Sequence, residues 1–131
     1  MFSNMPKPLN EVGAYNETTL WEGTITTPWT GGNLPLNDDL SKYDKLRIYS
    51  STPNTAPYNV TCYVEVEVSR FLASQPYFLA GFLSSSAIYA REFVYNSNTS
   101  ITFGNCYRLN VASTGANSCI PSKIVGLKAT N

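Results

Sequence analysis

Two glutamates, Glu65 and Glu67, are the residues whose type and spacing come nearest to a catalytic pair. They stand two positions apart in an alternating segment, so on a strand they would leave the same face about 6.6 Å apart. Inverting glycosidases hold their carboxylates about 6.5–9.5 Å apart, so glycan hydrolysis by Glu65 with Glu67 or Asp44 is one hypothesis. Side chains that leave one strand in parallel do not converge on a bond, however. An ordinary solvated or subunit-facing surface is therefore the interpretation we favour.

The chain contains no histidine. Histidine is the commonest general base and transition-metal ligand, so its absence excludes Ser-His-Asp catalysis, Cys-His catalysis and histidine-bound zinc. Asp38, Asp39 and Asp44 could offer oxygen ligands to calcium, but the D-x-D-x-D-G pattern of a calcium loop is missing. We therefore expect these aspartates to cap or turn the chain, and we expect neither a metal nor a cofactor.

Three cysteines, Cys62, Cys106 and Cys119, cannot all pair within one chain, and none has a C-x-x-C spacing. Buried thiols are the prediction, because a cysteine behaves as a small apolar residue. One disulfide with a third cysteine left over is the alternative, so the disulfide status stays open.

Aromatic residues form a larger candidate set: nine Tyr, six Phe and two Trp in 131 residues. Trp29 lies in a Gly-rich stretch and Tyr58 in a Pro-rich stretch. A flat ring with a polar edge suits a sugar or a protein surface, so Trp29 and Tyr58 are the predicted ligand-binding residues. The alternative is that they close the ends of the fold or fill an oligomer interface. Trp21 is assigned to the core or an interface.

Charge and hydropathy limit the partners of the chain. Nine Lys plus Arg balance nine Asp plus Glu, and only 14% of residues are charged. We therefore expect no nucleic-acid partner, because no excess of positive charge attracts phosphates. No stretch approaches the roughly 18 apolar residues of a membrane-spanning helix, and the first residues lack the pattern of a signal peptide. We expect a soluble protein made in a cytoplasm, with no membrane insertion.

The remaining sequence predicts short strands separated by Gly, Pro, Asn and Ser clusters. The clearest, residues 60–71, alternates so that Val60, Cys62, Val64, Val66 and Val68 share one face. In residues 45–51, Leu46 and Ile48 share a face opposite Lys45, Arg47 and Tyr49. Further strands are predicted at residues 19–26, 86–95, 100–104, 106–113 and 122–129. Residues 28–39 are predicted to be a loop, and residues 77–83 are ambiguous.

These elements predict an all-β domain at residues 19–131. Seven to eight short strands indicate an antiparallel, jelly-roll-like β-sandwich, which buries one face of each strand. Residues 1–18 are expected to form an extended arm or linker. Asp38 or Asp39 is expected to cap a short helical turn near residues 38–43, with Leu40 and Tyr43 folded over the end of the sandwich.

Three motifs, LWEGTIT, NDDLSKYDKLRIYSS and CIPSKIVGLKA, follow one another along the chain. In this order they resemble the C-terminal tip domains of bacteriophage tail fibres and related virion appendages. The resemblance spans about residues 20–128. The residues that carry it are Trp21, Gly23, Leu40, Ser41, Tyr43, Asp44, Leu46, Ile48, Tyr49, Ile120, Lys123, Ile124, Gly126, Leu127 and Lys128.

The resemblance implies a trimeric β-sandwich displayed on a virion, commonly at a fibre tip that binds the host surface. We therefore expect a non-enzymatic homotrimer that contacts other virion proteins and a host-surface glycan or protein. A fibre carries a long stalk upstream, whereas about 18 residues precede the first predicted strand here. The chain is thus either an excised tip or a short independent protein. A capsid or tail decoration protein that docks through its N-terminal arm is the second hypothesis for the function. A small glycan hydrolase is the third.

Overall fold

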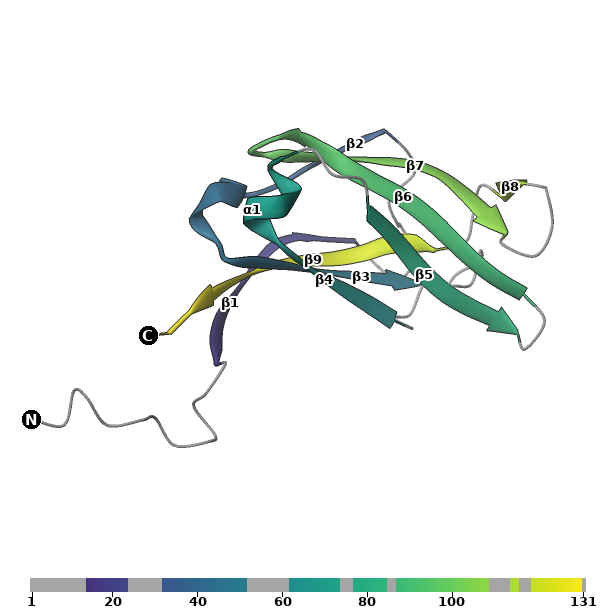
Figure 1. Cartoon of the computed structure of the whole chain (residues 1–131), viewed down its shortest axis with the longest axis horizontal. Coiled ribbons are helices and arrows are strands. Elements are labelled where there is room, and N and C mark those ends of the chain that lie inside the picture. The colour runs from purple at the N-terminus through teal and green to yellow at the C-terminus, as the bar shows by residue number, and fades with distance from the viewer. Residues whose placement is uncertain are drawn as a thin grey trace, which may run out of the picture.

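The structure is a computed structural model that describes residues 14–23, 32–51, 62–73, 77–84, 87–108, 114–115 and 119–130. They form two antiparallel sheets packed face to face (Figure 1). One sheet has the strand order β1 (Tyr15–Glu22), β9 (Ile120–Ala129), β3 (Lys45–Ser51) and β4 (Cys62–Glu67). The other has the order β2 (Asn33–Pro35), β7 (Ser100–Arg108), β6 (Ala87–Ser97) and β5 (Tyr77–Ser84), with β8 (Thr114–Gly115) paired to β7. The predicted all-β sandwich is confirmed.

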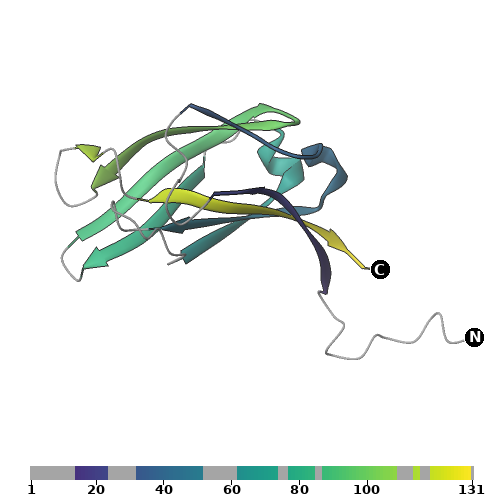
Figure 2. The same ribbon diagram turned by 180° about the vertical axis from the view of Figure 1, so that it is seen from behind.

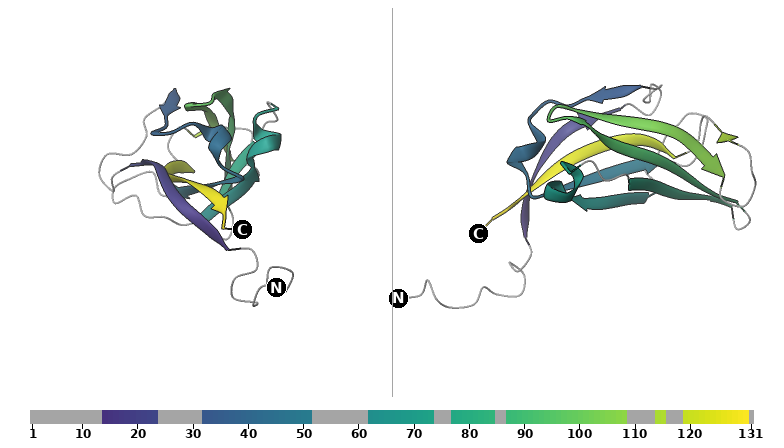
Figure 3. Two further views of the ribbon diagram at one scale, coloured as in Figure 1. Left: turned by 90° about the vertical axis from the view of Figure 1, so that its left-hand side faces the viewer. Right: turned by 45° about the horizontal axis from the view of Figure 1, so that its top comes forward.

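The strand connections resemble a jelly roll in their first part. The chain alternates between the sheets from β1 to β2 to β3, and β9 returns to lie beside β1 (Figure 2). By contrast, β3 with β4, β5 with β6, and β6 with β7 pair as sequence neighbours within one sheet. The views in Figure 3 show the two sheets as curved layers on either side of a common interior.

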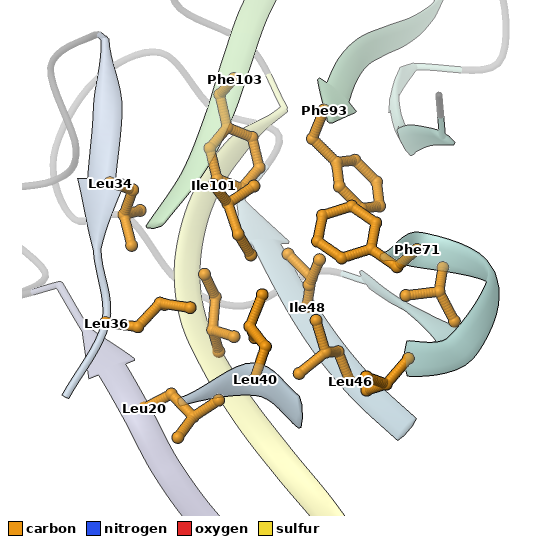
Figure 4. Packing of buried hydrophobic residues seen from close by; sticks show 13 residues of the cluster. Leu20, Leu34, Leu36, Leu40, Leu46, Ile48, Phe71, Phe93, Ile101 and Phe103 are labelled. Carbon is orange, nitrogen blue, oxygen red and sulfur yellow. The ribbon is translucent and has the colours of Figure 1, made fainter. Parts of the chain in front are cut away.

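The core fills this interior with aliphatic and aromatic side chains from both sheets (Figure 4). Leu46 and Ile48 point inward from β3, as their alternation predicts, and Phe93 and Ile101 face them from the second sheet. Burying one such side chain contributes about 1.5–3 kcal/mol before the cost of ordering it. The members of the cluster are Leu20, Leu34, Leu36, Leu40, Leu46, Ile48, Val66, Val68, Phe71, Phe93, Ile101, Phe103 and Ile124.

The predicted long strand at residues 60–71 was wrong at its end. β4 stops at Glu67, and α1 (Val68–Phe71) follows as a single helical turn. The amide of Val68 donates to the carbonyl of Asp44 instead of continuing a ladder. The turn brings Phe71 into the core, with its ring centroid 5.8 Å from that of Phe93. Burial of Phe71 therefore outweighs the strand alternation, which cannot reveal such a turn.

Three other boundaries also differ from the predictions. β1 begins at Tyr15, so the last four residues of the predicted arm belong to a strand that pairs with β9. β2 lies inside the predicted loop at residues 28–39, where Leu34 is buried opposite Ile101. β7 runs unbroken from Ser100 to Arg108, although two strands were predicted there. In each case, pairing with a distant strand extends an element beyond its local signal.

Candidate functional site

The two predicted ligand-binding residues, Trp29 and Tyr58, lie outside the described residues. The predicted glutamates are described, and they lie on the outer face of the four-stranded sheet. The β3–β4 register places Glu65 opposite Arg47, Glu67 opposite Lys45, and Tyr49 opposite Tyr63. The expectation that Glu65 and Glu67 share one face is thus confirmed. We use the name tyrosine–arginine face for the group formed by Glu17, Arg47, Tyr49, Tyr63 and Glu65.

Arg47 is the centre of this face. Its Nε and Nη2 donate to Oε1 of Glu65 at 2.9 and 2.7 Å. Its Nη1 donates to Oε1 of Glu17 at 2.8 Å and to the hydroxyl of Tyr49 at 3.2 Å. The hydrogen bond to Tyr49 and the bonds to Glu65 raise the pKa of the Arg47 guanidinium. Arg47 therefore stays charged and ties together β1, β3 and β4.

To reach Glu17 on β1, the Arg47 side chain must pass over β9, the strand between β1 and β3. At the outward positions of β9, Val125 lies opposite Arg47 and Leu127 lies opposite both Lys45 and Glu17. These two side chains are only 3% and 1% exposed, although they lie outside the core cluster. The methylene stem of an arginine covers apolar surface while its charged end reaches water, so Arg47 helps to bury this stripe.

Two tyrosines stand beside the guanidinium. The ring centroids of Tyr49 and Tyr63 are 5.6 Å apart, with the planes tilted by 54°. The guanidinium carbon of Arg47 is 5.1 Å from the centroid of the Tyr63 ring, within the range of a cation–π contact. Tyr63 is 58% exposed because it stands on β4, an edge strand. The face thus offers an aromatic surface to solvent, held in place by charged neighbours.

Sequence reasoning missed Tyr49 and Tyr63 as a pair. Alternation alone places Tyr49 on the same face as Arg47, and Tyr63 on the same face as Glu65. Only the register between β3 and β4 brings the two sets into contact. That register is fixed by which residues of both strands face the core, and the pattern within one strand does not reveal how the two strands align.

A second polar cluster, here called the clasp, consists of Asp38, Tyr43, Asp44 and Gly126. The Tyr43 hydroxyl donates to Oδ2 of Asp38 at 2.8 Å, and its ring lies directly against Gly126. A β-carbon at Gly126 would come within 2.6 Å of that ring. Oδ2 of Asp44 accepts from the amide of Ala129 at 2.8 Å. Two of the resemblance motifs therefore pack against each other, and their residues stabilise the fold.

The other aspartates also have local partners. Oδ1 of Asp39 accepts from the amide of Ser41 at 2.8 Å and caps the 3-10 helix η2 (Leu40–Lys42), so the predicted capped turn is confirmed. Hydrogen bonds from Lys42, Tyr43 and the Asp39 amide lower the pKa of Asp38 to about 2. Within the described part of the chain, no group of three acidic or cysteine side chains is arranged to hold a metal ion.

The W-x-G motif has a similar structural role. Trp21 packs against the core, and its ring lies over Gly23, where an added β-carbon would be 2.9 Å from the indole. The amide of Gly23 donates to the carbonyl of Ser122 on β9 at 2.9 Å. Trp21 was assigned to the core or an interface, and the structure places it, partly buried, against the edge of the core cluster. Gly23 permits a close approach of backbone and ring.

The structure describes the side chains of two of the three cysteines. Cys106 and Cys119 are buried thiols, as predicted, while the side chain of Cys62 lies outside what the structure describes. The Cys119 thiol donates to the carbonyl of Tyr89 at 3.1 Å. Nε of Arg91 donates to the carbonyl of Cys119 at 3.0 Å, and burial lowers the pKa of this guanidinium. This end of the sandwich is therefore a buried polar region that braces the start of β9.

On the outer face, both of the predicted glutamates lie in ion pairs. Glu65 is engaged by Arg47, and Glu67 lies 3.5 Å from Nε of Arg70, so each carboxylate has a cationic neighbour. Their side chains leave one strand in parallel, as the sequence indicated. What the face presents outward is two tilted rings, carboxylate oxygens and one shared guanidinium. The described residues enclose no pocket, so a ligand of this surface would lie across an open face.

No protein-family model matches the chain, and no curated protein matches it. Among the helices that the structure describes, none is both long enough and apolar enough to cross a membrane.

Proposed function

We propose that the chain is a non-enzymatic receptor-binding domain of a bacteriophage virion appendage, and that it recognises a host-surface glycan. In this proposal it is a homotrimer that also contacts other virion proteins. The β-sandwich fold and the three sequence motifs support the assignment to virion tip domains. The binding surface is the tyrosine–arginine face.

One observation carries the proposal: the exposed Tyr63 ring stands beside Tyr49 and above a guanidinium that is fixed by two carboxylates. Sugars present apolar ring faces and a rim of hydroxyls. An exposed aromatic ring packs against the apolar face of the sugar. Charged groups that are already held in place form hydrogen bonds with the sugar hydroxyls at little cost in side-chain entropy. The Arg47 bonds to β1 and β4 supply that preorganisation.

The test is a bacterial-glycan array probed with the intact chain and with two tyrosine variants. Tyr63→Ala removes the exposed ring of the tyrosine–arginine face. Tyr107→Ala removes a second exposed tyrosine of the described residues, which is 44% exposed on β7 of the second sheet. We expect the Tyr63 variant to lose about fivefold or more in affinity, because stacking a ring on an aromatic side chain contributes on the order of 1–3 kcal/mol to binding. The Tyr107 variant should bind as the wild type does. A wild-type chain that binds no arrayed glycan would contradict the proposed function.

A further inference from the structure

The donors of Arg47 are almost fully used within the tyrosine–arginine face. A guanidinium has five N–H donors, and those of Arg47 make four hydrogen bonds to Glu17, Glu65 and Tyr49. An anionic ligand binds arginine best through two parallel N–H donors on one edge of the guanidinium. Here the edge formed by Nε and Nη2 is already occupied by Glu65. Arg47 therefore acts as a support for the carboxylates and not as a clamp for an acid.

The acceptors on the same face are in surplus. Glu17 and Glu65 each use Oε1 for Arg47, and Oε2 of each has no hydrogen-bond partner among the described residues. A carboxylate oxygen accepts and cannot donate. The complementary ligand group is thus a hydroxyl, which donates to Oε2 of either glutamate while its sugar ring covers Tyr63.

The surrounding charge gives an acidic ligand no advantage. On the outward positions of the sheet, Glu17, Glu22, Glu65 and Glu67 are balanced by Lys45, Arg47 and Lys123 together with Arg70 of α1, which lies beside Glu67. Nζ of Lys45 lies 5.2 Å from the centroid of the Tyr15 ring, and Lys123 lies opposite Glu22 in the β1–β9 ladder. A ligand that carries carboxylate, sulfate or phosphate next to Tyr63 would meet the carboxylates of Glu17 and Glu65 and an Arg47 that they already occupy.

We infer that the tyrosine–arginine face binds neutral glycans and discriminates against acidic ones. This inference rests on the proposed function and names the ligand class of the same surface. Glu17 and Glu65 act as the residues that determine specificity: they accept hydroxyl hydrogen bonds and occupy the guanidinium that an acidic sugar would need.

The experiment compares matched oligosaccharides, a neutral hexose oligomer and its form oxidised to the uronate at C6, for each backbone that the array identifies. We expect the wild-type chain to bind the neutral form about tenfold or more tightly than the uronate, because like charges brought together cost several kcal/mol. The double variant Glu17→Gln with Glu65→Gln removes two negative charges and replaces the ion pairs of Arg47 with weaker hydrogen bonds to amide oxygens, which an acidic ligand can displace. Its preference should shift toward the uronate by a comparable factor.

Glu67→Gln is the matched control, because it makes the same change on the same strand and face at a residue with no hydrogen bond to Arg47. It should leave most of the neutral preference in place. Wild-type preference for the uronate would overturn the inference and leave the proposed function standing, whereas absence of all glycan binding would overturn both. A fall in sedimentation mass on Tyr63→Ala would mean that a second copy of the chain covers this face, and it would also overturn the inference.

Discussion

The clasp and the tyrosine–arginine face both centre on the strands of one sheet, and each combines tyrosine with carboxylates. In the clasp, the Tyr43 ring is pressed against Gly126, and its hydroxyl is held by Asp38. On the outer face, Tyr63 stands on an edge strand and leaves more than half of its surface in water. The clasp uses its side chains to join chain segments far apart in sequence. The outer face uses Arg47 to hold an exposed aromatic surface in place, so the first region joins the chain and the second is the one that we propose for binding.

The largest loss of stability is expected when the close contact between Tyr43 and Gly126 in the clasp is disturbed. Gly126→Ala would place a β-carbon 2.6 Å from the Tyr43 ring, so the ring or strand β9 must move. Forcing an extra carbon into a packed site costs about 1–3 kcal/mol, and we expect a loss of free energy of unfolding in this range, measured by urea denaturation. Gly104→Ala is the control, since its nearest neighbour would lie at an ordinary contact distance of 3.6 Å and its cost should stay within about 0.5 kcal/mol. Equal losses in both variants would remove the special role of Gly126.

A smaller loss of stability is expected at low pH, and it should also originate in the clasp. The folded-state pKa of Asp38 is about 2, below its ordinary value of 3.8, because Lys42, Tyr43 and the Asp39 amide hydrogen-bond to the carboxylate. A lowered pKa means that this stabilisation is complete above about pH 4 and is lost as the pH falls through about 2. Hydrogen bonds also lower the pKa values of Asp39 and Asp44, so their contributions have the same sign.

Urea titrations at a series of pH values between 5 and 2 test this expectation. The unfolding midpoint of the wild-type chain should fall across the range, and Asp38→Asn should start from a lower midpoint and fall less. Tyr43→Phe removes one hydrogen bond to Asp38 while keeping the ring on Gly126, so its pH dependence should lie between the two. Identical slopes for wild type and Asp38→Asn would show that Asp38 does not carry the acid sensitivity.

Sequence reasoning succeeded where a local pattern decides the structure. The alternation of Leu46 and Ile48 against Arg47 and Tyr49 correctly assigned the two faces of β3, because a strand has a fixed period of two. The cap at Asp39 was similarly accessible, since a short acidic side chain before a helical turn satisfies a nearby amide.

Sequence reasoning failed where distant contacts decide. Val68 satisfies the strand alternation, yet its amide bonds to Asp44 and the chain turns into α1. The tyrosine–arginine face was missed for the same reason, because Tyr49 and Tyr63 meet only through the β3–β4 register. The motif residues Tyr43 and Gly126 attracted attention through their pattern, but they turned out to lie in the clasp. These two motif residues therefore mark packing, whereas the tyrosine–arginine face combines Arg47 and Tyr49, from the motif that contains Tyr43, with Glu17, Tyr63 and Glu65, which lie outside the motifs.

The smallest effect on stability is expected at the residue with the largest expected effect on binding. Tyr63→Ala removes one ring of a cross-strand pair and a cation–π contact at a site open to solvent. Cross-strand pairs contribute roughly 0.2–1 kcal/mol, so the free energy of unfolding should fall by less than about 1 kcal/mol. Urea denaturation of the same samples used for the glycan array measures both quantities. A loss above about 2 kcal/mol would place Tyr63 in the same class as the clasp, because stability and binding would then depend on one set of contacts. A small loss of stability together with a large loss of affinity is the result that we expect if the Tyr63 ring serves the ligand and not the fold.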